Sequence, residues 1–177
     1  MRKFILFIGI ALASFTVNSQ VKSDALAEGS LLIEGNTGFG AGGVGNPANT
    51  SFNLFSQDGI TTWSLGAEGG YFVIDNLAAK IGLGYNDNDG ASSFSYKLGA
   101  KYYIVSKFPV QLDVVGASGD DVFPNETPLW LGVQGGYAWF VADNVSIEPG
   151  LRYNLSLNED FTDESIIEFN IGFALHF

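Results

Sequence analysis

The sequence of 177 residues contains no cysteine and a single histidine. Without cysteine there are no disulfide bonds, thiolate nucleophiles or cysteine-based zinc sites. Charged residues make up only 15% of the chain, against about a quarter in average domains. Basic residues number 8 against 19 acidic ones, so the formal net charge is −11. This balance argues against a nucleic-acid partner, because phosphate binding requires a basic surface.

Glycine and aromatic residues are the abundant classes. Glycine accounts for 23 residues, about 13% against a usual 7% or so, and aromatic residues for 14%. Tight turns and strands favour these residue types, so the composition indicates β-structure rather than helices. Hydrophobic residues make up 46% of the chain, which is typical of an ordered protein, and the length suits one domain.

The N-terminus has a pattern of its own. Two basic residues precede an apolar run of about ten residues, and Val17 and Ser19 fit the small-residue positions of a cleavage site. We therefore predict a cleaved secretory signal peptide at residues 1–20. The alternative, an N-terminal membrane helix, fits less well because the apolar run is short, and the rest of the chain has no apolar run of some 18 residues.

Large apolar residues alternate with small or polar residues through the rest of the chain. In the last segment, "IIEFNIGFALHF", every second residue from Ile167 to Phe177 is apolar. This period is typical of strands with one apolar and one polar face. It predicts eight strands, at about residues 30–39, 60–74, 77–86, 92–104, 108–117, 128–141, 145–157 and 165–177.

The predicted connections alternate between short turns and longer polar loops. Turns are expected at 75–76, 105–107 and 142–144, and loops at 40–59, 86–91, 118–127 and 158–164. An up-and-down barrel has this arrangement, because one rim carries the turns and the other carries the loops. The segment at 50–55 could extend the first hairpin or belong to a loop, and the sequence does not decide between them.

An internal repeat supports the hairpin assignment. The stretch "LGAEGGYFVIDN" at 65–76 resembles "LGVQGGYAWFVADN" at 131–144, and Gly66, Gly99 and Gly132 are evenly spaced by 33 residues. Each copy places aromatic residues beside a short turn, at the height where a membrane barrel carries an aromatic girdle. The predicted girdle comprises Tyr71, Phe72, Tyr102, Tyr103, Tyr137 and Trp139.

The two faces of the strands distinguish two types of barrel. A lipocalin-like soluble barrel would enclose the apolar side chains, whereas a membrane barrel turns them toward lipid. The polar face carries five acidic and four basic residues, a near-balance expected of a narrow interior where each charge needs a partner. In water the apolar face would be a very large exposed patch. We therefore predict an all-β, eight-stranded antiparallel up-and-down transmembrane β-barrel at 30–177. Its predicted interior charge network comprises Glu34, Glu68, Lys80, Lys97, Lys101, Asp113, Glu148, Arg152 and Glu168.

These features together resemble a known family. The signal peptide, the eight alternating strands, "GGYFVIDNLA" at 69–78 and the terminal Phe177 resemble the small OmpA/OmpX-type outer-membrane β-barrels of Gram-negative bacteria. The resemblance implies a barrel in outer-membrane lipid and lipopolysaccharide, preceded by a short periplasmic segment at 21–29. It also implies that the last strand is the signal read by the barrel-assembly machinery, through Phe169, Phe173 and Phe177.

Catalysis and cofactor binding are not expected. His176 lies on the polar face near the short-turn rim, and a serine and an acid would have to lie beside it for acyl transfer. We interpret it as a rim residue. The glycine-rich stretch at 38–47 leads into a loop with Asn and Pro rather than into a helix, so it is not a phosphate-binding loop.

The predicted loops carry acidic residues and no Lys or Arg. Such a rim attracts divalent cations, which also bridge lipopolysaccharide phosphates, although acidic loops also keep an exposed rim soluble. Asp87 and Asp89 precede a glycine as in part of a calcium loop, but Tyr85 stands where the first ligand should be. The ten acidic loop residues are Asp58, Asp87, Asp89, Asp120, Asp121, Glu126, Glu159, Asp160, Asp163 and Glu164.

Three functions stay open at this stage. The first is a structural or surface-interaction role in the outer membrane. The second is a narrow channel for small solutes or ions, which ranks lower because eight strands leave an interior just filled by side chains. The third and least expected is a lipid-modifying outer-membrane enzyme.

Overall fold

The computed structural model describes residues 23–40, 50, 52–57, 60–88, 90–119, 123 and 127–177. The predicted signal peptide at 1–20 lies outside these residues. Five of the acidic loop residues also lie outside them, namely Asp58, Asp89, Asp120, Asp121 and Glu126.

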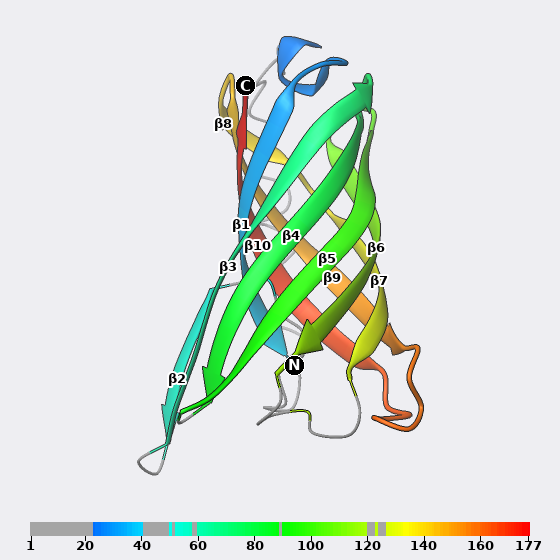
Figure 1. Ribbon diagram of the computed structural model, residues 1–177. Coiled ribbons are helices and arrows are strands. Elements are labelled where there is room, and N and C mark those ends of the chain that lie inside the picture. The colour runs from blue at the N-terminus through cyan, green and yellow to red at the C-terminus, as the bar shows by residue number, and fades with distance from the viewer. Residues whose placement is uncertain are drawn as a thin grey trace, which may run out of the picture.

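The described chain is almost entirely β-structure (Figure 1). One short 3-10 helix, η1, precedes the strands, and no helix among the described residues is long and apolar enough to cross a membrane. The elements are η1 (Ser23–Leu26), β1 (Leu31–Gly40), β2 (Asn53–Gln57), β3 (Ile60–Ile74), β4 (Leu77–Asn88), β5 (Ala91–Ile104), β6 (Phe108–Ser118), β7 (Leu129–Gly136), β8 (Trp139–Ala142), β9 (Val145–Ser156) and β10 (Ile166–His176).

The strands form one closed antiparallel barrel with eight strands around its wall. Neighbouring strands pair in the order β1-β10-β9-β7-β6-β5-β4-β3, and β1 closes the ring by pairing with β3. Closure leaves no sheet edge in the wall, as a membrane-spanning sheet requires. The predicted fold, an eight-stranded antiparallel up-and-down barrel, is confirmed.

The structure corrects one predicted strand and settles one segment that the sequence left undecided. The predicted strand at 128–141 is interrupted between β7 and β8, where the Tyr137 amide donates to the Pro149 carbonyl. Pro149 has no N–H to return the bond, so the ladder cannot continue there. The segment that the sequence left undecided forms β2, which pairs with the first part of β3 and lengthens that hairpin at the loop end (Figure 1).

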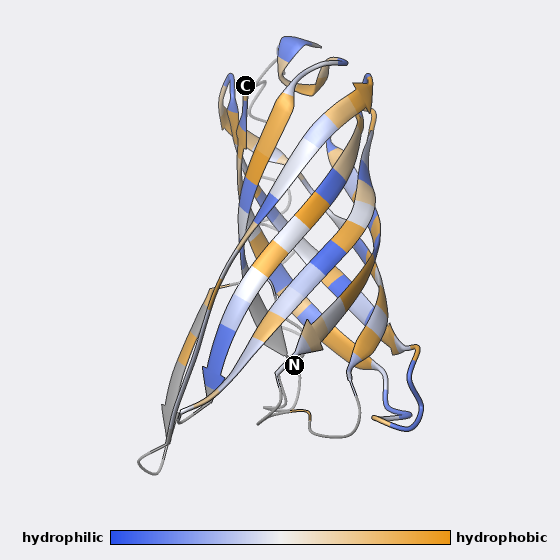
Figure 2. Ribbon diagram, in the orientation of Figure 1, coloured by the Kyte–Doolittle hydropathy of each residue, from blue (hydrophilic) through white to orange (hydrophobic). Residues whose placement is uncertain are grey.

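The side chains alternate across the wall as the period-two pattern predicts. Outward residues are apolar and exposed, as at Leu98 (70%) and Leu83 (64%), while Lys101 and Glu34 are each only 1% exposed inside the barrel. Figure 2 shows this as alternating orange and blue or white bands along β4 and β5. The exterior is therefore an apolar belt suited to lipid, and the interior is polar.

The short-turn end of the barrel is covered by η1 and the residues after it (Figure 1). Ala25 and Leu26 are buried in a cluster with apolar residues of the barrel interior. The Leu26 carbonyl accepts a hydrogen bond from the Asn76 amide, and the Gly29 amide donates to the Phe72 carbonyl. This part of the chain, which the sequence predicts only as a short N-terminal segment, is thus an apolar cap on that end.

Candidate functional site

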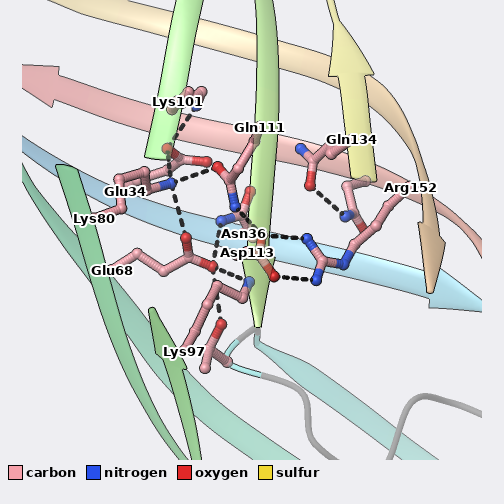
Figure 3. Close-up of polar contacts among 12 residues, drawn as sticks. Glu34, Asn36, Glu68, Lys80, Lys97, Lys101, Gln111, Asp113, Gln134 and Arg152 are labelled. Carbon is pink, nitrogen blue, oxygen red and sulfur yellow. Dashed lines mark hydrogen bonds and ion pairs between the residues drawn. The ribbon is translucent and has the colours of Figure 1, made fainter. Parts of the chain in front are cut away.

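The most distinctive site is the charged interior, where side chains from several strands point toward one another inside the barrel (Figure 3). Six charged side chains from β1, β3, β4, β5 and β9 form a linear series of ion pairs. Acidic and basic residues alternate along it, so each residue between the two ends contacts two residues of opposite charge. All five ion pairs in this series have N–O distances between 2.5 and 2.7 Å. In order of contact the series is Glu148, Lys101, Glu34, Lys80, Glu68 and Lys97. Its charges sum to zero, and we call it the six-charge series.

A second group is built around Arg152. Its guanidinium binds both carboxylate oxygens of Asp113, at 2.7 and 2.5 Å, and its Nε lies 3.9 Å from Glu168. Gln111 joins the two groups, because its Oε1 accepts from Lys80 at 2.9 Å and its Nε2 donates to Asp113 at 2.7 Å. All nine residues of the predicted network are buried and lie on this interior surface.

Neutral residues complete the coordination of the buried carboxylates. Glu148 accepts hydrogen bonds from the Tyr103 hydroxyl at 3.0 Å and the Ser146 hydroxyl at 2.7 Å. Glu68 accepts from Thr50 at 2.8 Å and from Asn36 at 3.3 Å. Buried ions need such additional hydrogen bonds, because ion pairing alone does not repay their desolvation.

Glycines on the same face provide the room for the long charged side chains. A Cβ atom at Gly132 would lie 1.9 Å from Nη2 of Arg152, and one at Gly82 would lie 3.0 Å from Cγ of Glu68. The guanidinium therefore occupies the space that any other residue would fill at position 132. In a barrel of eight strands the interior is just wide enough for side chains, so small residues must face large ones.

Apolar clusters close the interior at both ends. At the short-turn end the rings of Phe72 and Phe140 pack with the η1 cap. At the loop end the second cluster contains Val115, Ala117 and Trp130, with Phe123, Phe161 and Ile166 packed against it. The charged layer thus lies between two apolar layers, which lowers the local dielectric and strengthens every ion pair within it.

His176 lies inside the barrel beneath the cap rather than exposed on the rim. Its Nε2 is 3.1 Å from the Ser146 hydroxyl, and its ring packs against Phe72 and Phe140 at centroid distances of 6.2 and 5.3 Å. The Ser146 hydroxyl also hydrogen-bonds to Glu148, so the carboxylate contacts the serine and not the Nδ1 atom of the imidazole. A nucleophilic serine needs the histidine as its proton acceptor and the acid behind the ring, so this trio lacks the arrangement of a hydrolytic triad.

The six residues of the predicted aromatic girdle lie on both faces of the barrel wall. Tyr71, Tyr102 and Trp139 are exposed on the outer surface, and Tyr137 is half-buried against Phe108, 5.6 Å between ring centroids. Phe72 and Tyr103 were wrongly included, since both are fully buried in the interior. Consecutive strand residues point to opposite faces, so only one of each adjacent aromatic pair can face lipid.

A second outer aromatic group, not predicted from the sequence, lies near the loop end. Trp63 and Tyr85 are 5.5 Å apart between ring centroids, and Tyr85 and Phe94 are 5.3 Å apart, on the neighbouring strands β3, β4 and β5. In the sequence pattern Trp63 and Phe94 lie on the apolar face, close to the predicted loops. Those two features together could have predicted an aromatic group at this end of the barrel. Rings at this height match the second membrane interface.

The remaining predicted site residues are placed as follows. Phe169, Phe173 and Phe177 all face outward on or beside β10 and are exposed. Asp87 accepts a hydrogen bond from the Gly90 amide at 3.3 Å, while Asp89 lies outside the described residues. Among the described residues, no group of three or more His, Cys, Asp or Glu side chains is placed to hold a metal ion.

The comparisons with known proteins concern the fold. No protein-family model matches the chain, and no characterised protein matches it in sequence. The N-terminal β-barrel domain of OprF from Pseudomonas aeruginosa is similar, with a TM-score of 0.54 and 13% identity over 85% of this chain and 98% of that domain. Neisserial surface protein A gives a TM-score of 0.44 and 17% identity over 84% and 95% of the two chains. The closed eight-stranded barrel and its likeness to the OprF domain show that the chain has the fold of the small eight-stranded outer-membrane β-barrels.

Proposed function

We propose that the protein is an integral outer-membrane barrel with a structural or surface-interaction role and a closed interior. The apolar exterior fits hydrocarbon, and the aromatic groups near both ends fit the two interfaces. Its function then resides in its wall and its loops, and the proposal includes no catalytic role and no cofactor.

The observation that carries this proposal is the filled interior. The charged layer crosses the barrel through ion pairs and hydrogen bonds, and an apolar cluster covers it on each side. A solute would have to break several buried ion pairs to pass, and each broken pair leaves an uncompensated charge. A narrow channel is the alternative, and it requires this layer to rearrange.

The loops are the proposed contact surface. The described loop residues Glu159, Asp160, Asp163 and Glu164 are all exposed, and the predicted loops contain no Lys or Arg. We propose that this acidic rim contacts lipopolysaccharide phosphates through divalent cations, because direct contact would bring like charges together.

The C-terminal strand is the proposed assembly signal. Phe173 and Phe177 are 52% and 63% exposed on the outer surface, where a membrane-embedded assembly machinery can reach them. The strand also pairs with β1 and β9 in the closed barrel. It therefore joins the first strand of the barrel and helps to close the ring.

Conductance in planar lipid bilayers tests the closed interior. The folded protein, reconstituted at single-molecule density, is expected to give no stepwise current in molar potassium chloride. Defined, repeated conductance steps that scale with protein amount would favour the channel and contradict the closed interior.

A further inference from the structure

The junction between β1 and β3 is the shortest in the barrel wall, and we call it the β1–β3 seam. The two strands pair over only four residues each, 31–34 and 68–71, whereas β1 pairs with β10 over nine. Among the described residues, every other junction around the ring pairs at least seven residues of each strand. Each backbone hydrogen bond broken in hydrocarbon is costly, so a wall opens most readily where the fewest have to break.

The seam also holds the only like-charged pair of opposite residues in the described strands. Glu34 and Glu68 are direct cross-strand partners, and each is 1% exposed inside the barrel. The other charged residues of the interior network face glycine, alanine, valine or glutamine on neighbouring strands, apart from Arg152, which faces Glu168. Like charges directly opposite each other destabilise a strand pair, so this junction needs a cation.

Lys80 supplies that cation. It lies on β4, and its Nζ is 2.7 Å from Oε2 of Glu34 on β1 and 2.7 Å from Oε2 of Glu68 on β3 (Figure 3). Its amine therefore bridges the two strands of the seam. Lys97 and Lys101 each form an ion pair with only one of these two carboxylates. Without Lys80, two opposed carboxylates would remain in an interior of low dielectric.

A second segment closes the seam on its loop side. Thr50 is fully buried and its hydroxyl donates to Glu68 at 2.8 Å, while Phe52 is 56% exposed. The Phe52 amide donates to the Asn36 carbonyl on β1 at 2.8 Å, and the residues that follow pair with β3. The chain thus passes from the interior to the outer surface between β1 and β3. Glu68 binds both elements that close the seam, Lys80 and Thr50.

We propose that the β1–β3 seam is a lateral gate in the barrel wall and that Lys80 is its latch. The seam stays closed while Lys80 binds both carboxylates. When Lys80 releases them, the repulsion between Glu34 and Glu68 acts on the junction with the fewest backbone bonds, and the wall opens there first. The opening joins the charged interior to the surrounding lipid.

Disulfide links test where the wall opens, and the chain has no cysteine of its own. Ile33→Cys with Gly69→Cys joins opposite residues of the seam, and Gly35→Cys with Phe173→Cys joins opposite residues of β1 and β10. Both glycines have open space for a new side chain. In urea and an uncharged detergent, we expect the seam link to slow unfolding about tenfold or more, and the β1–β10 link to change the rate by no more than about twofold. A seam link that slows unfolding no more than the β1–β10 link overturns the gate.

Lysine variants test the latch. Lys80→Met should speed unfolding about tenfold or more, and the seam link should cancel most of this effect because the strands can then no longer separate. Lys97→Met removes another buried amine of the six-charge series, one that pairs with Glu68 but not with β1. It should speed unfolding equally with and without the seam link. An effect of Lys80→Met that persists in full in the linked protein overturns the latch.

Two double variants separate the opposed carboxylates from the net charge of the interior. Lys80→Met/Glu34→Gln and Lys80→Met/Glu148→Gln both return the six-charge series to neutrality, but only the first removes the like-charged pair. The first should unfold more slowly than Lys80→Met, and the second should not. If Lys80→Met does not fold, recovery of folding in the first double variant alone is the same test. Equal recovery in both double variants, or recovery in neither, overturns the latch.

Discussion

At the scale of single residues, the packing of the interior depends on glycines that leave space for long charged side chains. Gly132 and Gly135 are three positions apart on β7 but face opposite sides of the wall. A Cβ atom at Gly132 would lie 1.9 Å from the Arg152 guanidinium, whereas a Cβ atom at Gly135 has no heavy atom within 4 Å. Gly132→Ala should therefore destabilise the barrel by about 1–3 kcal/mol, and Gly135→Ala should be nearly neutral. Heat-modifiable gel mobility of the two variants measures this difference, and equal melting of both would contradict the described packing.

The charge of Arg152 can be tested separately from its size. Arg152→Met keeps a long side chain but leaves Asp113 and Glu168 without their cation, which should cost about 3–5 kcal/mol. Lys107→Met removes an exposed charge from the short-turn rim and should change stability by no more than about 0.5 kcal/mol. Urea-induced unfolding in detergent compares the two, and a small loss at Arg152 would mean that its charge is not buried.

At the scale of elements, the η1 cap closes the short-turn end through apolar contact. Leu26 is 2% exposed against the interior cluster, while Glu28 on the same segment is exposed. Leu26→Ala should lower the free energy of unfolding by about 2 kcal/mol or more, and Glu28→Ala should have little effect. Amide hydrogen exchange at Gly29 and Asn76 should increase only in the first variant. Unchanged exchange there would show that Leu26 does not hold the cap.

At the scale of the whole molecule, the alternating sequence pattern predicts the barrel and the two faces of its wall. It does not predict the features that depend on contacts between segments distant in the sequence. Alternation alone placed the nine network residues inside, because a period of two assigns every residue of a strand to one face. The same period puts Phe72 and Tyr103 on the inner face. Their assignment to the girdle was wrong because each was grouped with the neighbouring tyrosine that faces outward. The η1 cap has no periodicity, and Leu26 acquires its role only from distant strands. The break near Tyr137 likewise depends on Pro149, a residue of the neighbouring strand.

In the proposed orientation, the apolar surface meets hydrocarbon and the ions lie within the barrel. The most direct measurement is refolding of the purified chain without residues 1–20 from urea, with and without an uncharged detergent, followed by circular dichroism and size-exclusion chromatography. We predict β-structure and a monodisperse species only with detergent, and aggregation without it, because the exposed apolar belt cannot remain in water. A monomeric, folded protein in plain buffer would contradict the account.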